Sequence, residues 1–412
     1  MNSYKNKFSI AIIILALGFL LVPIISYIRY LAMDYNYPPV SAEVRMPAVL
    51  IFTLLSYAYW IFLNSERLNF ETKPKKSVVF AVFALGVFLC SIYPLFSIDL
   101  YEYIIRGRIF TVYHANPYIY TPIQFTQDLF YNIPTAKIFW EKSTMIYGPV
   151  WTYIVSAVTM IAGNSIFVNL FLLKLVLFML HVLCAFSIYK IAVELKIESP
   201  VKAAYAYLLN PFILIVTAVD GHMDTSMICF LLLSLYLLYK GRIYLSFFTL
   251  SISIMTKYFS VFIAPFYIIY LYAHIQDKRV LFKKLFISFV VSAVTILIAY
   301  LPFCKGFRVF SEFKTMLTGI DSTTFTYWYN KLLCFLLPGI SLEVFRYLCY
   351  AFFALIYFSL LVFFVFSKNK AQKLPLMILL VFSAYIIFAA FQLNPWYLLM
   401  IIPFILISDI PK

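Results

Sequence analysis

FSIDLYEYIIRGRIFTVYHANPYIY, residues 96–120, follows directly on an apolar run and is too polar to cross a lipid bilayer. The apolar run before it covers residues 77–95, and the first charge after it is Asp99. Arg106 and Arg108 come next and are interleaved with aromatic residues. A carboxylate at the end of a membrane span, followed by a basic and aromatic segment, predicts chemistry at a membrane surface.

The composition is that of a polytopic membrane protein. Of the 412 residues, 64% are hydrophobic and 12% are charged, whereas soluble domains contain about 25% charged residues. We predict an all-α, single membrane domain over residues 1–412, in which at least one helix is short or does not span the bilayer. Its about 13 hydrophobic segments are expected at roughly 8–31, 47–63, 77–96, 148–162, 166–189, 201–217, 225–239, 243–256, 258–273, 284–303, 345–366, 374–391 and 396–410.

The net charge of +15 lies mostly in short connections between these segments and does not indicate nucleic-acid binding. By the positive-inside rule, the basic connections near 65–76, 240–242, 274–283 and 367–373 are cytoplasmic. The chain is therefore expected in a plasma membrane as a multi-pass protein, with a bacterial host favoured. The six cysteines show no pairing motif, so no structural disulfide is expected, and Cys304–Cys334 is the one pair worth testing.

Two long loops, 97–147 and 304–344, are nearly balanced in charge and are predicted to lie outside. The first is expected to carry interfacial helices. In helical register Asp99, Glu102/Tyr103 and Arg106 share one face. This leaves Ile104, Ile105, Ile109 and Phe110 for contact with lipid.

When each connection is assigned to one side of the membrane, the region between Tyr147 and Asp220 gives a conflict. Both residues are expected outside, yet three apolar segments separate them, where an even number of crossings is required. Either one of these segments does not span, or the run 166–189 is split. Short and broken helices are tolerated where they line a cavity inside a protein.

Four polar groups are predicted at external helix ends. They are Asp99 with Glu102, the stretch 220–224, Thr256-Lys257-Tyr258, and the stretch 392–397. If they converge, they form a pocket with carboxylates, a histidine, cations and aromatic rings. Such a pocket supplies what a general base and an anionic leaving group need.

The residues of the first loop also have structural interpretations. Glu102 and Arg106 are four residues apart, a spacing typical of an ion pair on a helix surface. Arg106 and Arg108 are equally compatible with contacts to lipid headgroups. Asp99 has the weakest structural interpretation, because a carboxylate beside a span is costly unless it has a task.

The remaining candidates are ambiguous in the same way. His222 is as compatible with a structural hydrogen-bonding residue as with a participant in chemistry. Asp224 is also suited to cap the following helix. Trp396 and Tyr397 are also typical of the aromatic belt at a membrane interface.

The order of short motifs resembles that of a known superfamily. Asp-x-Tyr-x-Tyr-x3-Gly-Arg from residue 99 is followed by Asn-Pro-Tyr (116–118), Tyr-Gly-Pro (147–149), Gly-His-x-Asp (221–224), Lys-Tyr (257–258) and Asn-Pro-Trp-Tyr (394–397). This series resembles the GT-C integral-membrane glycosyltransferases, and most of all the bacterial polyprenyl-phosphate-mannose-dependent mannosyltransferases. The resemblance is spread over most of residues 78–400.

The resemblance implies an inverting transfer of a hexose, expected to be mannose, from a polyprenyl-phosphate donor to a hydroxyl of a lipid or glycan acceptor. Asp99 takes the place of the catalytic base, on the non-cytoplasmic membrane face. No cofactor is expected; a divalent metal shared by Asp99 and Asp224 is an alternative that we do not favour. The expected substrate-binding residues are Tyr101, Tyr103, Arg106, Arg108, Asn116, Tyr118, Tyr147, His222, Asp224, Lys257, Tyr258, Trp396 and Tyr397.

Two other functions use similar features. A transporter or flippase of lipid-linked sugars would line its path with the same polar groups and do no chemistry, although such proteins often show repeated halves that this chain lacks. A polysaccharide polymerase or ligase would hold a lipid diphosphate with the same basic residues. In all three cases the partners are membrane lipids and lipid-linked sugars.

Overall fold

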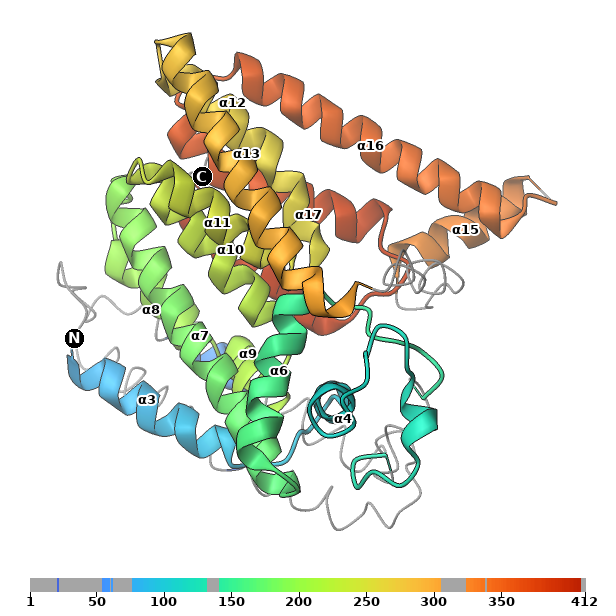
Figure 1. Ribbon diagram of the computed structural model, residues 1–412. Helices are drawn as coiled ribbons and strands as arrows, with labels where there is room; N and C mark the ends of the chain where they lie inside the picture. Colours follow the sequence, from blue (N-terminus) through green and yellow to red (C-terminus); the bar gives the residue numbers. More distant parts are fainter. Residues whose placement is uncertain are drawn as a thin grey trace. The chain divides into compact units, whose positions relative to one another are not determined.

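The computed structural model describes residues 21, 54–59, 61, 76–131, 141–304, 324–337 and 339–408. Every regular element among these residues is a helix (Figure 1). The chain divides into two compact units: unit 1 contains Met1–Tyr189 and Glu198–Cys229, and unit 2 contains Lys190–Ile197 and Phe230–Lys412. Each unit is described by itself, and the single membrane domain over 1–412 stays a prediction.

Unit 1 is built mainly from helices of the first half of the chain. They are α3 (Lys76–Cys90), α4 (Asp99–Thr111), the 3-10 helix η1 (Pro122–Phe125), α6 (Pro149–Ala162), most of α7 (Ile166–Glu194), α8 (Pro200–Leu208), α9 (Pro211–Leu214), the π-helix η2 (Ile215–Val219) and the start of α10 (Asp224–Tyr239).

Unit 2 holds the rest of α10 and the later helices. They are α11 (Ile243–Ile254), η3 (Tyr258–Ile263), α12 (Ala264–His274), α13 (Lys278–Tyr300), η4 (Leu301–Phe303), α15 (Phe325–Leu336), α16 (Leu342–Phe366), α17 (Lys370–Phe388), η6 (Pro395–Met400) and α18 (Ile402–Ile407).

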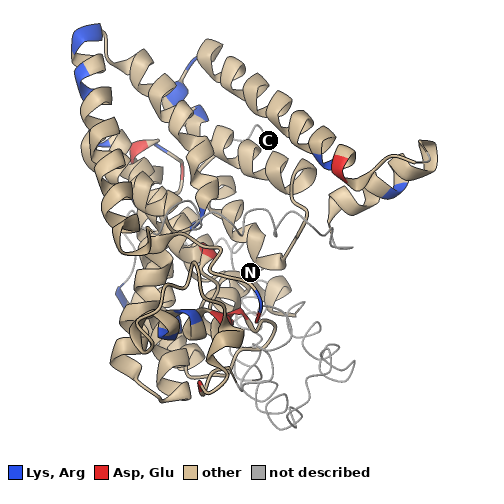
Figure 2. Ribbon diagram, turned by 45° about the vertical axis from the view of Figure 1, so that its right-hand side comes forward, with Lys and Arg blue, Asp and Glu red and all other residues tan. Residues whose placement is uncertain are grey.

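The chain is a membrane protein by the length and composition of its helices. Among the described residues, 4 helices are long and apolar enough to span: Ile166–Glu194, Lys278–Phe303, Leu342–Phe366 and Lys370–Phe388. Most of the helical ribbon carries no charge (Figure 2). The other predicted segments in this part of the chain form shorter apolar helices or the bent pair described below. The predicted segments 8–31 and 47–63 lie largely outside the described residues.

The predicted span 77–96 ends early. Helix α3 stops at Cys90, and residues 91–98 are not helical. Pro94 lies in this stretch and has no N–H for a helical hydrogen bond. Asp99 is therefore not the end of a span, because it is the first residue of a new helix, α4.

The expectation that α4 turns an apolar face to lipid is wrong. Ile104, Ile105 and Ile109 are 0% exposed, and every residue of α4 from Leu100 to Ile109 is buried. Glu102, Arg106 and Arg108 are thus enclosed by protein, whereas Asp99 and Phe110 stay partly exposed. Two acidic residues in the first turn and Arg108 in the last turn suit the helix dipole.

Helix α6 packs along the whole of α4. The two helices cross closely at Gly107, where a Cβ atom would lie 2.7 Å from Cγ1 of Val155. Near their C-terminal ends, the hydroxyls of Thr111 and Thr159 are 3.0 Å apart. The absence of a side chain at Gly107 allows this approach.

Helix α7 is continuous from Ile166 to Glu194. The alternative that the run 166–189 is split is therefore wrong. Its Phe178 ring packs directly on Gly86 of α3, where a Cβ would lie 2.0 Å from the ring. The glycine thus makes room for an aromatic contact between α3 and α7.

The segment after α7 is the broken one. The pair Pro200–Leu208 and Pro211–Val219 is bent by 46°, the geometry of a broken span or a re-entrant loop. Pro211 cannot continue the helix, and Asn210 caps the new one by accepting from the N–H of Phe212 at 3.0 Å. His181 of α7 contacts the Leu208 carbonyl at 3.1 Å and satisfies it at the break.

Within unit 2, tyrosine hydroxyls join the helices to neighbouring backbone. The hydroxyl of Tyr239 donates to the Ala371 carbonyl at 2.7 Å, and that of Tyr357 donates to the Phe262 carbonyl at 2.9 Å. An apolar cavity of about 400 Å³ lies between α15, α16 and α17. All six cysteines of the chain are free thiols.

Candidate active site

Asp99 lies at the N-terminus of α4, next to a histidine from a distant part of the chain. Its Oδ2 is 3.6 Å from Nδ1 of His222 and 3.5 Å from the hydroxyl of Tyr103, which donates to it. His222 is almost fully buried, whereas the Asp99 side chain keeps 17% of its surface exposed. Asp99 is therefore held by internal groups and still open to a reactant.

A tight turn between η2 and α10 presents His222. Gly221 has a φ of +73°, which an L side chain adopts only with strain. The N–H of His222 donates to the Val216 carbonyl at 3.1 Å, which fixes the turn to the π-helix. Single π-helical turns occur frequently at functional sites.

Asp224, the second predicted acid, begins α10 and is 1% exposed. The charges of Asp99 and Asp224 both act on the Tyr103 phenol. Burial, the neighbouring Tyr147 and these two carboxylates raise the pKa of Tyr103 well above its ordinary value. The phenol therefore stays neutral and acts as a hydrogen-bond donor to Asp99.

Aromatic side chains enclose Tyr103. Its ring contacts those of Tyr147 and Trp151 edge to face, with centroids 5.6 Å and 5.1 Å apart. Tyr101, the other tyrosine predicted beside Asp99, is 9% exposed. The tyrosines of the first motif are thus packed into unit 1.

Arg106 pairs with Glu102 inside the protein, so the expectation of a pair on the helix surface is wrong. Its Nε donates to Oε1 of Glu102, and its Nη2 donates to the hydroxyl of Ser143 at 3.0 Å. The two charged side chains are 2% and 7% exposed. Burial raises the pKa of Glu102 above its ordinary value, although Arg106 acts to lower it.

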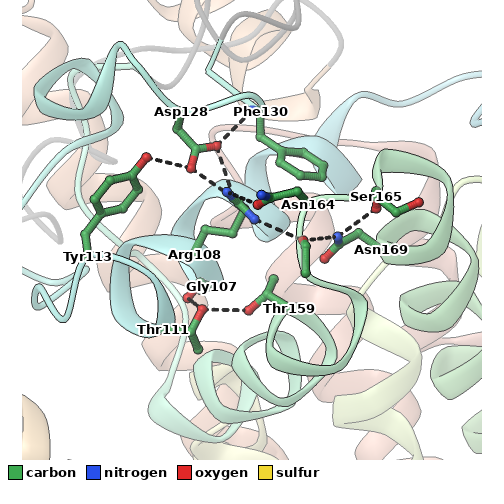
Figure 3. A network of polar contacts seen from close by, with 11 residues as sticks. Gly107, Arg108, Thr111, Tyr113, Asp128, Phe130, Thr159, Asn164, Ser165 and Asn169 are labelled. Carbon is green, nitrogen blue, oxygen red and sulfur yellow. Dashed lines mark hydrogen bonds and ion pairs between the residues drawn. The ribbon is translucent and has the colours of Figure 1, made fainter.

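Arg108 lies at the centre of a polar network that closes the first loop (Figure 3). Its Nε donates to both carboxylate oxygens of Asp128, at 3.1 Å and 2.9 Å. Nη1 donates to the Gly163 carbonyl at 3.0 Å, and Nη2 donates to Oδ1 of Asn164 at 3.1 Å. This guanidinium therefore connects α4, the loop after it and the end of α6.

The Asn-Pro-Tyr motif holds the two ends of the loop together. Oδ1 of Asn116 accepts from the N–H of Tyr118 at 3.0 Å. The Tyr118 hydroxyl donates to the Tyr147 carbonyl at 2.8 Å and lies 3.0 Å from the hydroxyl of Thr152. Tyr118 is 1% exposed, so the structure places this predicted substrate contact in an internal clasp.

In unit 2, the two predicted turns meet each other. Nζ of Lys257 lies 4.4 Å above the centre of the Tyr397 ring, a cation–π contact. The hydroxyl of Tyr258 is 2.9 Å from that of Tyr300. Trp396 is half-buried in η6. Convergence of this pair of turns with the unit 1 residues stays a prediction.

Sequence reasoning missed the buried charges of Lys174 and Asp128, and it named Asp220 only as part of the stretch 220–224, without a role of its own. Asp220 and Lys174 bind the backbone between α3 and α4, and Asp128 binds Arg108. Lys174 had a visible signal, since a lone lysine inside an apolar run is costly without a partner.

No three His, Cys, Asp or Glu side chains gather as a metal site in the part of the chain that the structure describes. Metal dependence stays untested.

Comparison with known proteins places the chain in a family. No solved structure matches the chain. An alpha-(1->6)-mannopyranosyltransferase A of Mycobacterium tuberculosis (strain ATCC 25618 / H37Rv) is 24% identical over 220 residues, which are 53% of this chain and 42% of that protein. The chain thus matches less than half the length of this curated relative. The family model described as "Alpha-(1->6)-mannopyranosyltransferase, N-terminal domain" matches residues 9–273. The chain belongs to this mannosyltransferase family.

Proposed function

We propose that this protein transfers mannose from a polyprenyl-phosphate donor to a hydroxyl group of a lipid or glycan acceptor, with inversion at the sugar C1. The observation that carries the proposal is the Asp99 carboxylate, partly exposed and 3.6 Å from His222. The relative's name makes an α-(1→6) mannosidic linkage the first product to test.

Asp99 acts as the general base. It accepts the proton of the acceptor hydroxyl while the bond from that oxygen to C1 forms and the bond from C1 to the phosphate oxygen breaks. The polyprenyl phosphate leaves as an anion and needs no proton from a general acid. His222 and the neutral Tyr103 orient the carboxylate of Asp99.

The leaving phosphate requires positive charge. Arg106 and Arg108 are already paired inside unit 1 with Glu102 and Asp128, so Lys257 is the better candidate. Lys305 and Arg308, two further candidates in the second long loop, lie outside the described residues.

A lipid donor fits the apolar surfaces of unit 2. Trp396 and Tyr397 offer flat rings for a sugar face or an isoprenoid chain. The apolar cavity of about 400 Å³ between α15, α16 and α17 is also suited to a polyprenyl chain. In unit 1, we propose that Tyr101 and Asp224 contact the sugar.

The site lies on the extracytoplasmic side in this proposal. Helix α6 follows α4 from end to end and so stays on the side of Asp99. From Lys174, which contacts the Ile92 carbonyl, α7 rises about 30 Å to Glu194, enough to cross the hydrocarbon core. The bent segment from Pro200 returns to Asp220, so two crossings separate Tyr147 from Asp220.

An Asp99→Asn variant tests the proposal. Purified protein is incubated with radiolabelled polyprenyl-phosphate mannose and cell-envelope lipids, and products are identified by mass spectrometry. Loss of the base is expected to lower kcat about 10²–10⁴-fold. Asp277→Asn is the matched control, because Asp277 caps α13 on an exposed connection and should leave activity unchanged.

The same assay separates the other two functions. Movement of lipid-linked sugar across vesicles without transfer, equal for wild type and Asp99→Asn, would support a flippase and refute the proposal. Product formed only from a lipid diphosphate donor would support a polymerase or ligase instead.

A further inference from the structure

The chain segments that carry Asp99 and His222 are joined directly by hydrogen bonds. Asp220 lies just before the turn of His222, and its Oδ1 accepts from the backbone N–H groups of Leu95 at 2.7 Å and Phe96 at 2.9 Å. Phe96 lies shortly before Asp99 in the chain. The segment before Asp99 is therefore bound to the segment before His222, and the two side chains themselves lie 3.6 Å apart.

A buried lysine holds the same segment at a second point. Nζ of Lys174 donates to the carbonyl of Ile92, and its charge interacts with that of Asp220. Lys174 is 1% exposed and Asp220 is 2% exposed. Residues 91–98 lie between two helices, and these side chains supply hydrogen-bond partners for the Ile92 carbonyl and the N–H groups of Leu95 and Phe96.

The turn itself packs against the beginning of α4. A Cβ atom on Gly221 would lie 2.5 Å from Cδ1 of Leu100 and 3.2 Å from Cγ of Lys174. Leu100 is the residue next to Asp99. The turn and the start of α4 are therefore in contact through packing as well as through the hydrogen bonds of Asp220.

We propose that Asp220 and Lys174 are positioning residues, which fix the Asp99 carboxylate relative to His222 by binding the backbone of residues 91–98. The inference rests on the proposed function of Asp99 as the base. Both residues act through the backbone on the placement of Asp99. A displacement of a catalytic group by about 1 Å can lower a rate about 10²-fold.

A positioning role differs from a purely structural one in what it changes. A structural residue affects the amount of folded protein, and the folded fraction then turns over normally. A positioning residue changes kcat in the folded protein and leaves donor binding largely intact. A variant of Asp220 that keeps the acceptor oxygen but lacks the negative charge should also recover the kcat of wild type.

Hydrogen–deuterium exchange on the full chain in detergent tests the anchoring without any substrate. Asp220→Ala removes the acceptor and is expected to speed exchange across 91–98 about tenfold. Asp220→Asn keeps a carbonyl oxygen at the same place and should stay close to wild type. Asp277→Ala is the control, since Asp277 also accepts from two consecutive N–H groups, of Arg279 at 2.8 Å and Val280 at 3.3 Å.

Steady-state kinetics then test the catalytic consequence. Asp220→Ala is expected to lower kcat about 10- to 100-fold, with the donor KM within about twofold of wild type. Asp220→Asn should recover most of the rate. Lys174→Met removes the other anchor and should show the same loss of kcat, which keeps the test decisive if Asp220→Ala does not fold.

Unchanged exchange across 91–98 in both Asp220→Ala and Lys174→Met would overturn the anchoring. Faster exchange with an unchanged kcat would overturn the positioning role, as would an Asp220→Asn variant as slow as Asp220→Ala. An inactive wild-type protein would refute the proposed function instead, and the exchange result would still decide whether Asp220 and Lys174 anchor the segment.

Discussion

Replacing Arg108 with Met tests whether this cation supports the fold or binds the leaving phosphate. The variant removes every hydrogen bond that the guanidinium donates and leaves the Asp128 carboxylate, 0% exposed, without its cation. Removing one partner of a buried ion pair costs about 3–5 kcal/mol. Two donors remain on Asp128, the hydroxyl of Tyr113 at 2.9 Å and the N–H of Phe130 at 2.8 Å. We therefore expect a loss of about 3 kcal/mol, at the low end of that range.

The loss should be local to the first loop. Limited proteolysis and hydrogen exchange across residues 112–131 measure it, and the donor KM of the folded fraction should not change. A double variant, Arg108→Met with Asp128→Leu, removes both charges and should recover much of the stability. Arg242→Met, on an exposed connection, is the control and should stay within about 0.5 kcal/mol of wild type. An Arg108→Met protein of normal stability with a donor KM raised at least about tenfold, which corresponds to 1.4 kcal/mol of lost binding, would refute this reasoning and return Arg108 to the phosphate.

Three further predictions concern packing, pH and metal. Gly107→Leu should lower stability by about 1–3 kcal/mol, measured by thermal unfolding, because its side chain would overlap Val155; an unchanged melting temperature would contradict the packing of α4 on α6. Because burial raises the pKa of Glu102, the folded protein binds a proton more tightly than the unfolded one, so stability falls as pH rises from the unfolded pKa through the folded pKa. Melting temperatures between about pH 4 and 8 should show this fall in wild type and not in Glu102→Gln. Chelation should leave transfer activity intact; a loss restored by Mg²⁺ or Mn²⁺ would overturn the expectation of a metal-free site.

The sequence predicted the meeting of Asp99 with His222 because both were expected at external helix ends and because the order of their motifs resembles that of the GT-C glycosyltransferases. It did not predict the buried ion pair of Arg108 with Asp128. Helical spacing shows that Arg106 can reach Glu102, since both lie on one helix. The partner of Arg108 lies in the irregular chain after α4, where no periodicity fixes which way Asp128 points.

The odd number of apolar segments between Tyr147 and Asp220 is a second case in which a local pattern was insufficient and tertiary contacts were needed. Hydropathy counts α6 as one segment like the others, because its residues are apolar on average. Its contacts distinguish it: Trp151 at one end packs on Tyr103, and Gly163 at the other accepts from Arg108, so both ends of α6 lie against α4. We expect a helix that accompanies a short, charged helix in this way to stay beside it and not to cross about 30 Å of lipid. If α6 stays with α4, the crossings between Tyr147 and Asp220 become even, and the acids at residues 99 and 224 share one side of the membrane.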